Sequence, residues 1–258
     1  MRLMQKTLGA VAALALSVSL LAGCGSTAGS AAASSSAAGS TAVSAVSEAA
    51  SSEAADENEA VAAQLMKDLT GSYQELWPVI LADEHTQTWL DDCTALVGED
   101  NAEGAYEKLS SMVTGDVYGE DAVKAYANGG GAYFCGFTQG LATLTFDGEN
   151  SVISGTDKDG STLFSHSYHY IGMEPVRGLY EFKSDDADSG EFTYFFLAPD
   201  TSAETYHIEF RYGSDADALG QYDAGDYAYW LASGISTDCD QTMIDNCIQL
   251  FCTENLAG

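Results

Sequence analysis

The stretch Gly178–Gly213 decides the fold, and its sequence is GLYEFKSDDADSGEFTYFFLAPDTSAETYHIEFRYG. It holds three runs of bulky and aromatic residues, which are Gly178–Lys183, Glu191–Leu197 and Thr205–Tyr212. The joints between them, SDDADSG and APDTSAE, are rich in Asp, Ser, Gly and Pro. Aromatic and β-branched residues favour strands, whereas these small and polar residues favour turns. The stretch therefore predicts three consecutive antiparallel strands.

The third run alternates between apolar and polar side chains. Successive side chains of a strand point to opposite faces, so one face of this strand is apolar and the other polar. The apolar face carries Tyr206, Ile208, Phe210 and Tyr212. The polar face carries Thr205, His207, Glu209 and Arg211. We expect any binding site of the domain to lie on the polar face, because a histidine, a carboxylate and a guanidinium group meet there.

Short runs with a period of two continue upstream and bring the total to about seven strands. The additional runs are Tyr133–Phe137, Leu141–Phe146, Val152–Ser154 and Leu163–Ile171. Apolar stripes at helical spacing predict helices over Glu59–Leu69, Thr86–Val97, Ala102–Val113 and Glu120–Ala127, and a last helix after a capping box that begins at Thr237. The fold class is thus mainly β with flanking α-helices. The strands form either a meander closed into a small antiparallel barrel or a sandwich.

Residues 1–23 have the order of a bacterial secretory signal peptide, with a basic start, an apolar body and small residues before a cysteine. The apolar run is too short for a spanning helix. Leu21-Ala22-Gly23-Cys24 is similar to the lipobox of lipoproteins, in which cleavage leaves Cys24 as a lipidated N-terminus; an ordinary signal peptide with an incidental cysteine is the alternative. Residues 24–58, rich in Ser and Ala, predict a flexible tether, and residues 59–258 remain for one domain.

The chain is strongly acidic. Its 39 Asp and Glu residues against nine Lys and Arg give a formal net charge of −30. Such a charge repels nucleic-acid phosphates and anionic lipid head groups, so we expect no nucleic-acid partner and no membrane contact other than a lipid anchor. It also concentrates cations near the surface. Solubility of an exported protein is the simpler explanation of the same acidity.

The six cysteines do not form a recognisable framework. If Cys24 carries lipid, five remain without a CxxC pair, which argues against a thiolate zinc site and against a fully paired set of disulfides. The helical stripe around Cys93 predicts a small core residue. Cys252 is expected opposite the apolar stripe of the last helix, and Cys239 just before that helix. These two are therefore better disulfide candidates than Cys247.

No catalytic signature is present. The sequence has no GxSxG, no phosphate loop and no HExxH, so we do not expect an enzyme. The acidic turn Asp185–Glu191 is similar to part of a calcium loop, but it lacks the third ligand position and the bidentate glutamate of such a loop. This departure favours a solvated hairpin turn.

Three of the four histidines are weak candidates for a site of their own. His85 precedes a predicted helix and is expected at the surface. His166 and His169 lie an odd number of residues apart on one predicted strand. A regular strand points them to opposite faces, so they bind one metal only if the strand bulges.

His207 is the strongest candidate for a metal ligand. Glu209 shares its strand face, and Asp200 and Glu204 lie just upstream. A neutral imidazole with two or three carboxylates suits zinc and other borderline divalent cations. A hydrogen-bonded structural histidine is the alternative.

Five pieces of the chain, taken in order, resemble the ZinT family of extracytoplasmic zinc-binding proteins, which also forms the C-terminal domain of some zinc-specific ABC-transporter lipoproteins. The pieces are LTGSYQELWPVIL (69–81), YHYIG (168–172), GLYEFKSDDADSGEFTYFFL (178–197), AETYHIEFRYG (203–213) and DYAYWLASGIS (226–236). Together they span nearly everything after the tether. The resemblance implies a calycin-like or lipocalin-like β-barrel with flanking helices and a zinc site at its mouth.

The resemblance also implies where zinc would bind. The family's site uses a His-x-His pair on one strand face and a histidine from the loop before it. Carried over residue by residue, the second histidine of the pair falls on His207 and the first on Thr205. The preceding loop holds no histidine, and Asp200 lies near the expected place. His207 is thus the one imidazole that matches.

These observations predict an extracytoplasmic lipoprotein, attached to a bacterial cell membrane by lipid alone, that binds a divalent metal ion. Zinc is the first choice, for buffering or for delivery to a metal ABC transporter. The expected ligands are His207, Asp200, Glu204 and Glu209, with His169 or His166 recruited from a neighbouring strand. Two alternatives stay open, which are a calycin-type module for a small apolar solute and a surface lipoprotein that acts through protein partners.

Overall fold

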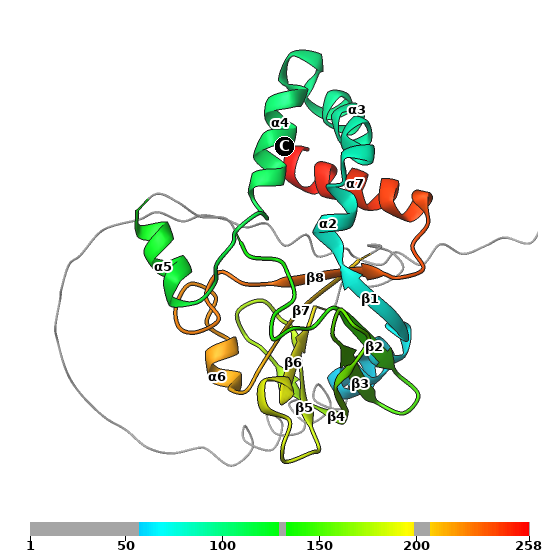
Figure 1. The fold of residues 1–258 in the computed structure, drawn as a ribbon, viewed down its shortest axis with the longest axis vertical. Helices are drawn as coiled ribbons and strands as arrows, with labels where there is room; N and C mark the ends of the chain where they lie inside the picture. The colour runs from blue at the N-terminus through cyan, green and yellow to red at the C-terminus, as the bar shows by residue number, and fades with distance from the viewer. Residues whose placement is uncertain (1–56, 129–132, 199–206, 258) are drawn as a thin grey trace, which may run out of the picture. The chain divides into compact units, whose positions relative to one another are not determined.

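The computed structural model describes residues 57–128, 133–198 and 207–257. Its strands form one closed antiparallel barrel, in which each strand pairs with its neighbours in sequence and β8 returns to β1 (Figure 1). The strands are β1 Gly71–Glu75, β2 Thr143–Asp147, β3 Val152–Thr156, β4 Thr162–Met173, β5 Tyr180–Ser184, β6 Tyr194–Leu197, β7 Ile208–Gly213 and β8 Ala232–Ser236. The expected calycin-like barrel with flanking helices is confirmed, and the sandwich is wrong because the sheet closes on itself.

The three runs that decided the fold form β5, β6 and β7. The register places Phe182 beside Phe195 and Phe195 beside Tyr212, so aromatic side chains lie level on three adjacent strands. Cross-strand aromatic pairs stabilise a sheet by a few tenths to about 1 kcal/mol each. β6 begins later than predicted, because a 3-10 turn over Gly190–Phe192 precedes it.

The barrel has eight strands rather than about seven, and the expected set was wrong at three places. β1 runs directly into helix α2 (Leu76–Ile80) without a turn, and β8 is built from the small residues ASGIS. Neither segment has the bulky alternation that marks a strand in sequence. Tyr133–Phe137 is not a strand, since Phe134 forms only isolated bridges, to Thr114 and Trp230.

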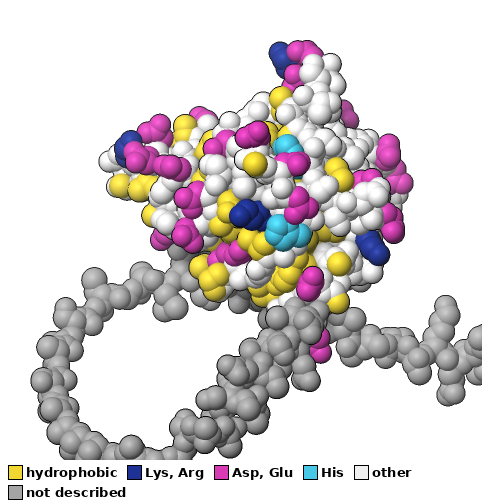
Figure 2. Space-filling view, turned by 90° about the horizontal axis from the view of Figure 1, so that it is seen from below, with side chains coloured by type: hydrophobic (Ala, Val, Ile, Leu, Met, Phe, Trp, Pro, Cys, Tyr) yellow, Lys and Arg dark blue, Asp and Glu magenta, His cyan; other side chains and the backbone are white. Residues whose placement is uncertain are grey.

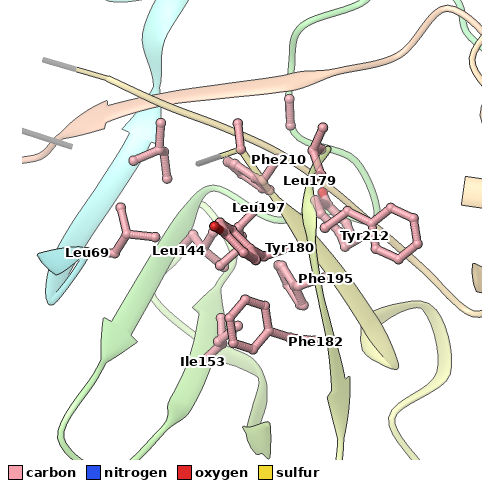
Figure 3. Packing of buried hydrophobic residues seen from close by; sticks show 14 of the residues in the cluster. Leu69, Leu144, Ile153, Leu179, Tyr180, Phe182, Phe195, Leu197, Phe210 and Tyr212 are labelled. Atoms are coloured by element: carbon pink, nitrogen blue, oxygen red, sulfur yellow. The ribbon is translucent and has the colours of Figure 1, made fainter. Parts of the chain in front are cut away.

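Apolar and aromatic side chains fill the barrel interior (Figure 3). Phe195, Phe210 and Tyr212 are fully buried, and their ring centroids lie 5.3 to 6.4 Å apart. Phe164 and Phe192 stack at 3.9 Å. Burying a side chain of this size stabilises the fold by about 1.5–3 kcal/mol. These rings are therefore the main source of the barrel's stability.

The helix that the sequence predicts over Glu59–Leu69 spans residues 57–68 and packs on this barrel. Ala62, Leu65, Met66 and Leu69 join the barrel core. Gly148, in the turn between β2 and β3, lies against the end of this helix and donates its N–H to Thr70 Oγ1 at 3.2 Å. A Cβ at position 148 would overlap the Met66 carbonyl oxygen. A glycine is therefore required for the helix to approach the turn.

The other helices are α3 Thr86–Val97, α4 Glu99–Ser111, α5 Glu120–Ala127, α6 Ala216–Leu219 and α7 Gln241–Leu256. Together with α2, the helices α3, α4 and α7 enclose a second core beyond one end of the barrel (Figure 1). Trp89 is fully buried there and donates its indole N–H to the Ile80 carbonyl oxygen at 2.7 Å. Trp77 meets Phe251 edge to face at 4.8 Å. The flanking helices thus form a packed layer of their own.

The structure corrects three expectations about this helical layer. Asp240, not Thr237, caps α7 by accepting the Met243 N–H at 2.9 Å. His85 is buried rather than at the surface, and its Nδ1 lies 3.3 Å from Nε2 of Gln241. Cys252 faces the core and is fully buried, because α3 packs on the side of α7 that was expected to face solvent.

The surface reflects the acidic composition. Figure 2 shows Asp and Glu side chains spread over the face it draws, with few Lys and Arg among them. Within the described ranges, no helix combines the length and the apolar character that a membrane span requires.

Candidate functional site

β7 presents its two rows of side chains as the sequence predicts. Ile208, Phe210 and Tyr212 belong to the barrel core and are fully buried. His207, directly before the strand, and Glu209 lie on the other side by the alternation of the chain. Glu209 is level with Ser233 of the neighbouring strand β8, so these two side chains lie on the same face of the sheet. His207 and Glu209, two of the expected metal ligands, therefore lie outside the barrel interior.

The structure brings His207 and Glu209 together. His207 Nε2 lies 3.9 Å from Glu209 Oε1, and the two side chains are 20% and 38% exposed. An imidazole and a carboxylate at this separation and exposure can share one cation. The other two expected oxygen ligands, Asp200 and Glu204, lie outside the described residues.

Cys135 lies close enough to Glu209 for the carboxylate charge to act on its thiol. Burial first, and the negative charge of Glu209 second, raise the pKa of Cys135 to about 12. The thiolate is the form that binds metal, and at neutral pH almost none of it is present. Cys135 is therefore a neutral thiol in the metal-free protein.

Two described ligands are fewer than zinc requires. Zinc is held by three or four protein side chains in almost all of its sites. Within residues 57–128, 133–198 and 207–257, no group of three or more His, Cys, Asp or Glu side chains is placed to hold a metal ion. The described residues alone therefore do not complete a zinc site.

His166 and His169 lie on opposite faces of β4, as predicted. His166 stands in the inward row and stacks near Phe164, with ring centroids 5.9 Å apart, whereas His169 points outward. Cross-strand register places His169 beside Lys183, Lys183 beside Tyr194, and Tyr194 beside Gly213. His169 is thus level with the far end of β7 from His207, and the structure does not bring these two together.

Each of these histidines instead holds the turn after β5. His166 Nδ1 lies 2.8 Å from Asp186 Oδ2, and His169 Nδ1 lies 2.6 Å from Asp185 Oδ1. The turn is further closed by Ser189, whose hydroxyl donates to Ser184 Oγ at 2.7 Å. The acidic turn is therefore a hairpin turn tied to β4 by two imidazole–carboxylate pairs. The sequence pattern did not predict that its aspartates pair with histidines. A prediction of the β4–β5 register, which sets Tyr168 beside Ser184, would have placed these aspartates next to the two histidines.

Arg211, expected on the polar face beside His207 and Glu209, has a structural role. Its guanidinium group is fully buried and donates to the carbonyl oxygens of Leu219, Tyr227 and Gln221. It also lies 4.4 Å from the ring centroid of Tyr222. Burial lowers the pKa of Arg211 from its usual value, but the group stays charged because that value is very high. Arg211 anchors the chain between β7 and β8 and is buried away from the solvent that His207 and Glu209 reach.

The Tyr222 ring is shared with a second guanidinium group. Arg177 lies 4.2 Å from its centroid, and the Tyr222 hydroxyl donates to the buried carboxylate of Glu174 at 3.2 Å. Glu174 also accepts the N–H groups of Val176 and Arg177, at 2.6 and 2.8 Å. Burial raises the pKa of Tyr222 above its usual value, so the phenol stays neutral. No sequence pattern predicts this network, because Tyr222 lies 48 residues from Glu174 in the chain.

Comparisons with known proteins find similarity in structure. No protein-family model and no curated protein matches the sequence. One similar solved structure is the Zn(II)-bound ZinT-like domain of AdcA from Streptococcus pneumoniae, with 12% identity, a TM-score of 0.45, and 70% of this chain and 88% of that chain covered. Another is Zn(II)-bound AdcA from Streptococcus pneumoniae, with 12% identity, a TM-score of 0.41, and 70% and 34% covered. At 12% identity, the likeness is one of fold alone.

Proposed function

We propose that the chain is an extracytoplasmic binding protein, not an enzyme, that takes up a divalent cation beside His207. The observation that carries the proposal is the pair of His207 and Glu209, whose side chains are partly exposed and lie 3.9 Å apart. A net charge of −30 favours the approach of cations to this pair. Asp200 and Glu204, within a few residues of His207 in the sequence, are the further ligands that we propose.

The donor set determines which cations suit the site. One imidazole with carboxylate oxygens favours zinc less than three imidazoles do, and it shifts the preference towards harder divalent cations. Zinc is still the first candidate that we propose, because His207 supplies an imidazole. The donor set predicts only modest affinity for zinc, which would be bound as cargo for buffering or for delivery to an importer.

Calorimetry with zinc tests the proposal. The purified chain, freed of metal by a chelator and dialysis, is titrated with ZnCl₂. We expect binding heat from the unaltered chain. His207→Ala is expected to weaken binding by about 100-fold or more, since loss of a group that only hydrogen-bonds to a metal ligand already costs about 10- to 100-fold.

His169→Ala is the matched control. It also removes an exposed imidazole paired with a carboxylate, but on a part of the sheet that register separates from His207. We expect the same binding heat from this variant as from the unaltered chain. No heat from the unaltered chain would contradict metal binding, and equal heat from the His207 variant would contradict the site.

The two alternatives have less support. A small apolar solute needs open space, yet the described barrel interior holds close ring pairs such as Phe164 and Phe192. A protein partner would use exposed apolar side chains, and Ile171, Met173 and Val176 lie near one another in the chain around the end of β4. Three such residues are too few to set the partner alternative above the cation.

A further inference from the structure

Two cysteines from opposite ends of the domain meet in the helical layer. Cys93 belongs to α3 and Cys252 to α7, and both are fully buried. Their sulfur atoms lie 3.9 Å apart. Among the cysteines in the described ranges, these are the two whose sulfur atoms are in contact. We propose that Cys93 and Cys252 form a disulfide that ties α3 to α7.

The surroundings hold both side chains in place. Trp89 lies one turn before Cys93, and Ile248 one turn before Cys252, and both are fully buried. Thr88 on α3 also donates to Asp245 on α7 at 3.5 Å. These contacts hold the two helices against each other, so the sulfur atoms stay close while they approach from 3.9 Å to the disulfide bond length of about 2.05 Å.

The bond forms by two thiol–disulfide exchanges with a small or protein disulfide as oxidant. The thiolate of one cysteine attacks a sulfur of the oxidant, which gives a mixed disulfide and releases one thiolate. The thiolate of the other cysteine then attacks the protein-side sulfur and releases the second thiolate. Two protein thiols are oxidised, one oxidant disulfide is reduced, and the two protons lost by the protein end on the released thiols.

The burial of the two thiols determines at which stage of folding the exchange can occur. It raises the pKa of the Cys93 thiol and of the Cys252 thiol above the usual value, so the folded, reduced protein presents very little thiolate. Exchange is therefore fast while the chain is unfolded and slow once α7 has docked. The same burial protects the bond against reductants after folding.

Oxidative refolding of the full chain tests this proposal independently of the metal site. The chain is unfolded in urea with a reductant and refolded with reduced and oxidised glutathione. Free thiols are then alkylated under denaturing conditions, and the protein is digested without reduction. We expect the peptide that contains Cys93 to be joined to the one that contains Cys252, with a mass lower than their sum by two hydrogen atoms. We expect the refolded protein to lose thermal stability when it is reduced.

Two variants control the test. Cys252→Ser removes the joined peptide, and Cys247→Ser, which changes a buried cysteine on the same helix, leaves it intact. Alkylation of both Cys93 and Cys252 in the refolded, unaltered chain would overturn the proposal. A peptide that joins Cys252 to any other cysteine, such as Cys239, would overturn it as well.

Discussion

Glu181 is a carboxylate that the barrel holds in an unfavourable place. It lies on β5 beside Gly172 and Phe196 of the neighbouring strands. Burial is the main cause that raises the pKa of Glu181, and the negative charges of Glu174 and Asp217 add to it. A raised pKa means that the folded chain holds the Glu181 proton more tightly than the unfolded chain does. Ionisation of this side chain therefore works against folding.

This environment predicts that Glu181→Gln stabilises the protein in a pH-dependent way. The unaltered chain loses stability as the pH rises from the usual glutamate value of 4.5 through the raised value in the fold, and the variant does not. We expect a higher melting temperature for the variant at pH 7 and no advantage at pH values below 4.5. Thermal unfolding of both proteins across this range measures the effect.

Glu149→Gln is the control, because Glu149 is exposed in the turn between β2 and β3. It is expected to follow the unaltered chain at every pH. If the melting temperatures of Glu181→Gln and the unaltered chain change with pH in the same way, ionised Glu181 does not destabilise the fold.

At the scale of single residues, the sequence predicts what depends on local alternation. His207 shares a side with Glu209, and His166 and His169 part to opposite faces, because a strand alternates wherever it lies. Arg211 obeys the same alternation but is covered by the chain between β7 and β8. Local alternation gives the direction of a side chain, whereas only tertiary contacts decide whether it meets solvent.

At the scale of elements, α5 has the bounds that the sequence predicts, and β5 to β7 follow from their bulky runs and polar joints. β1 and β8 escape prediction, because a short strand without bulky alternation owes its conformation to its partners. The segment Tyr133–Phe137 has bulky residues but is not a strand. Its side chains pack into the core, and its backbone forms only isolated bridges. Helices and strands with a clear hydrophobic period can be predicted from the sequence, whereas strands that form only by pairing with neighbouring strands cannot.

The contact between the helix over residues 57–68 and the β2–β3 turn predicts that one added methyl group at Gly148 lowers the stability of the fold. Gly148→Ala would place a Cβ against the Met66 carbonyl oxygen and the Lys67 Cα. Both are backbone atoms that cannot rotate away, so the helix must move off the barrel core. We expect a loss of about 1–3 kcal/mol, or more, in the free energy of unfolding. Urea denaturation followed by circular dichroism measures it.

Gly104→Ala provides the comparison. Gly104 lies within α4, and a Cβ there would meet no atom within 4 Å. Alanine favours a helix over glycine by up to about 1 kcal/mol, so this variant should be as stable as the unaltered chain or more stable. A Gly148 variant as stable as the Gly104 variant would contradict the close contact.

At the scale of the whole molecule, the net charge bears on the proposed attachment to a membrane. A net charge of −30 opposes binding to anionic lipid head groups, so we propose that any attachment comes from a lipid on Cys24. Cys24→Ser is therefore predicted to move the protein from the membrane fraction to the soluble fraction. Fractionation of the producing cells, followed by immunoblotting, measures the shift.

Cys239→Ser is the control for that experiment, since it removes a partly exposed cysteine of the folded domain. It should stay with the membranes. A Cys24 variant that also remains there would contradict the lipid anchor.

The closing contact of the barrel has a consequence for how the chain folds. Tyr73 of β1 pairs with Ser236 of β8, so the first and last strands of the sheet meet each other. Native contacts between distant segments slow folding, because a long loop must close before they form. During synthesis β1 has no partner on that side until the segment that forms β8, residues 232–236, has been made. The ribosome must therefore deliver about 160 further residues after β1 before the sheet can become a closed ring.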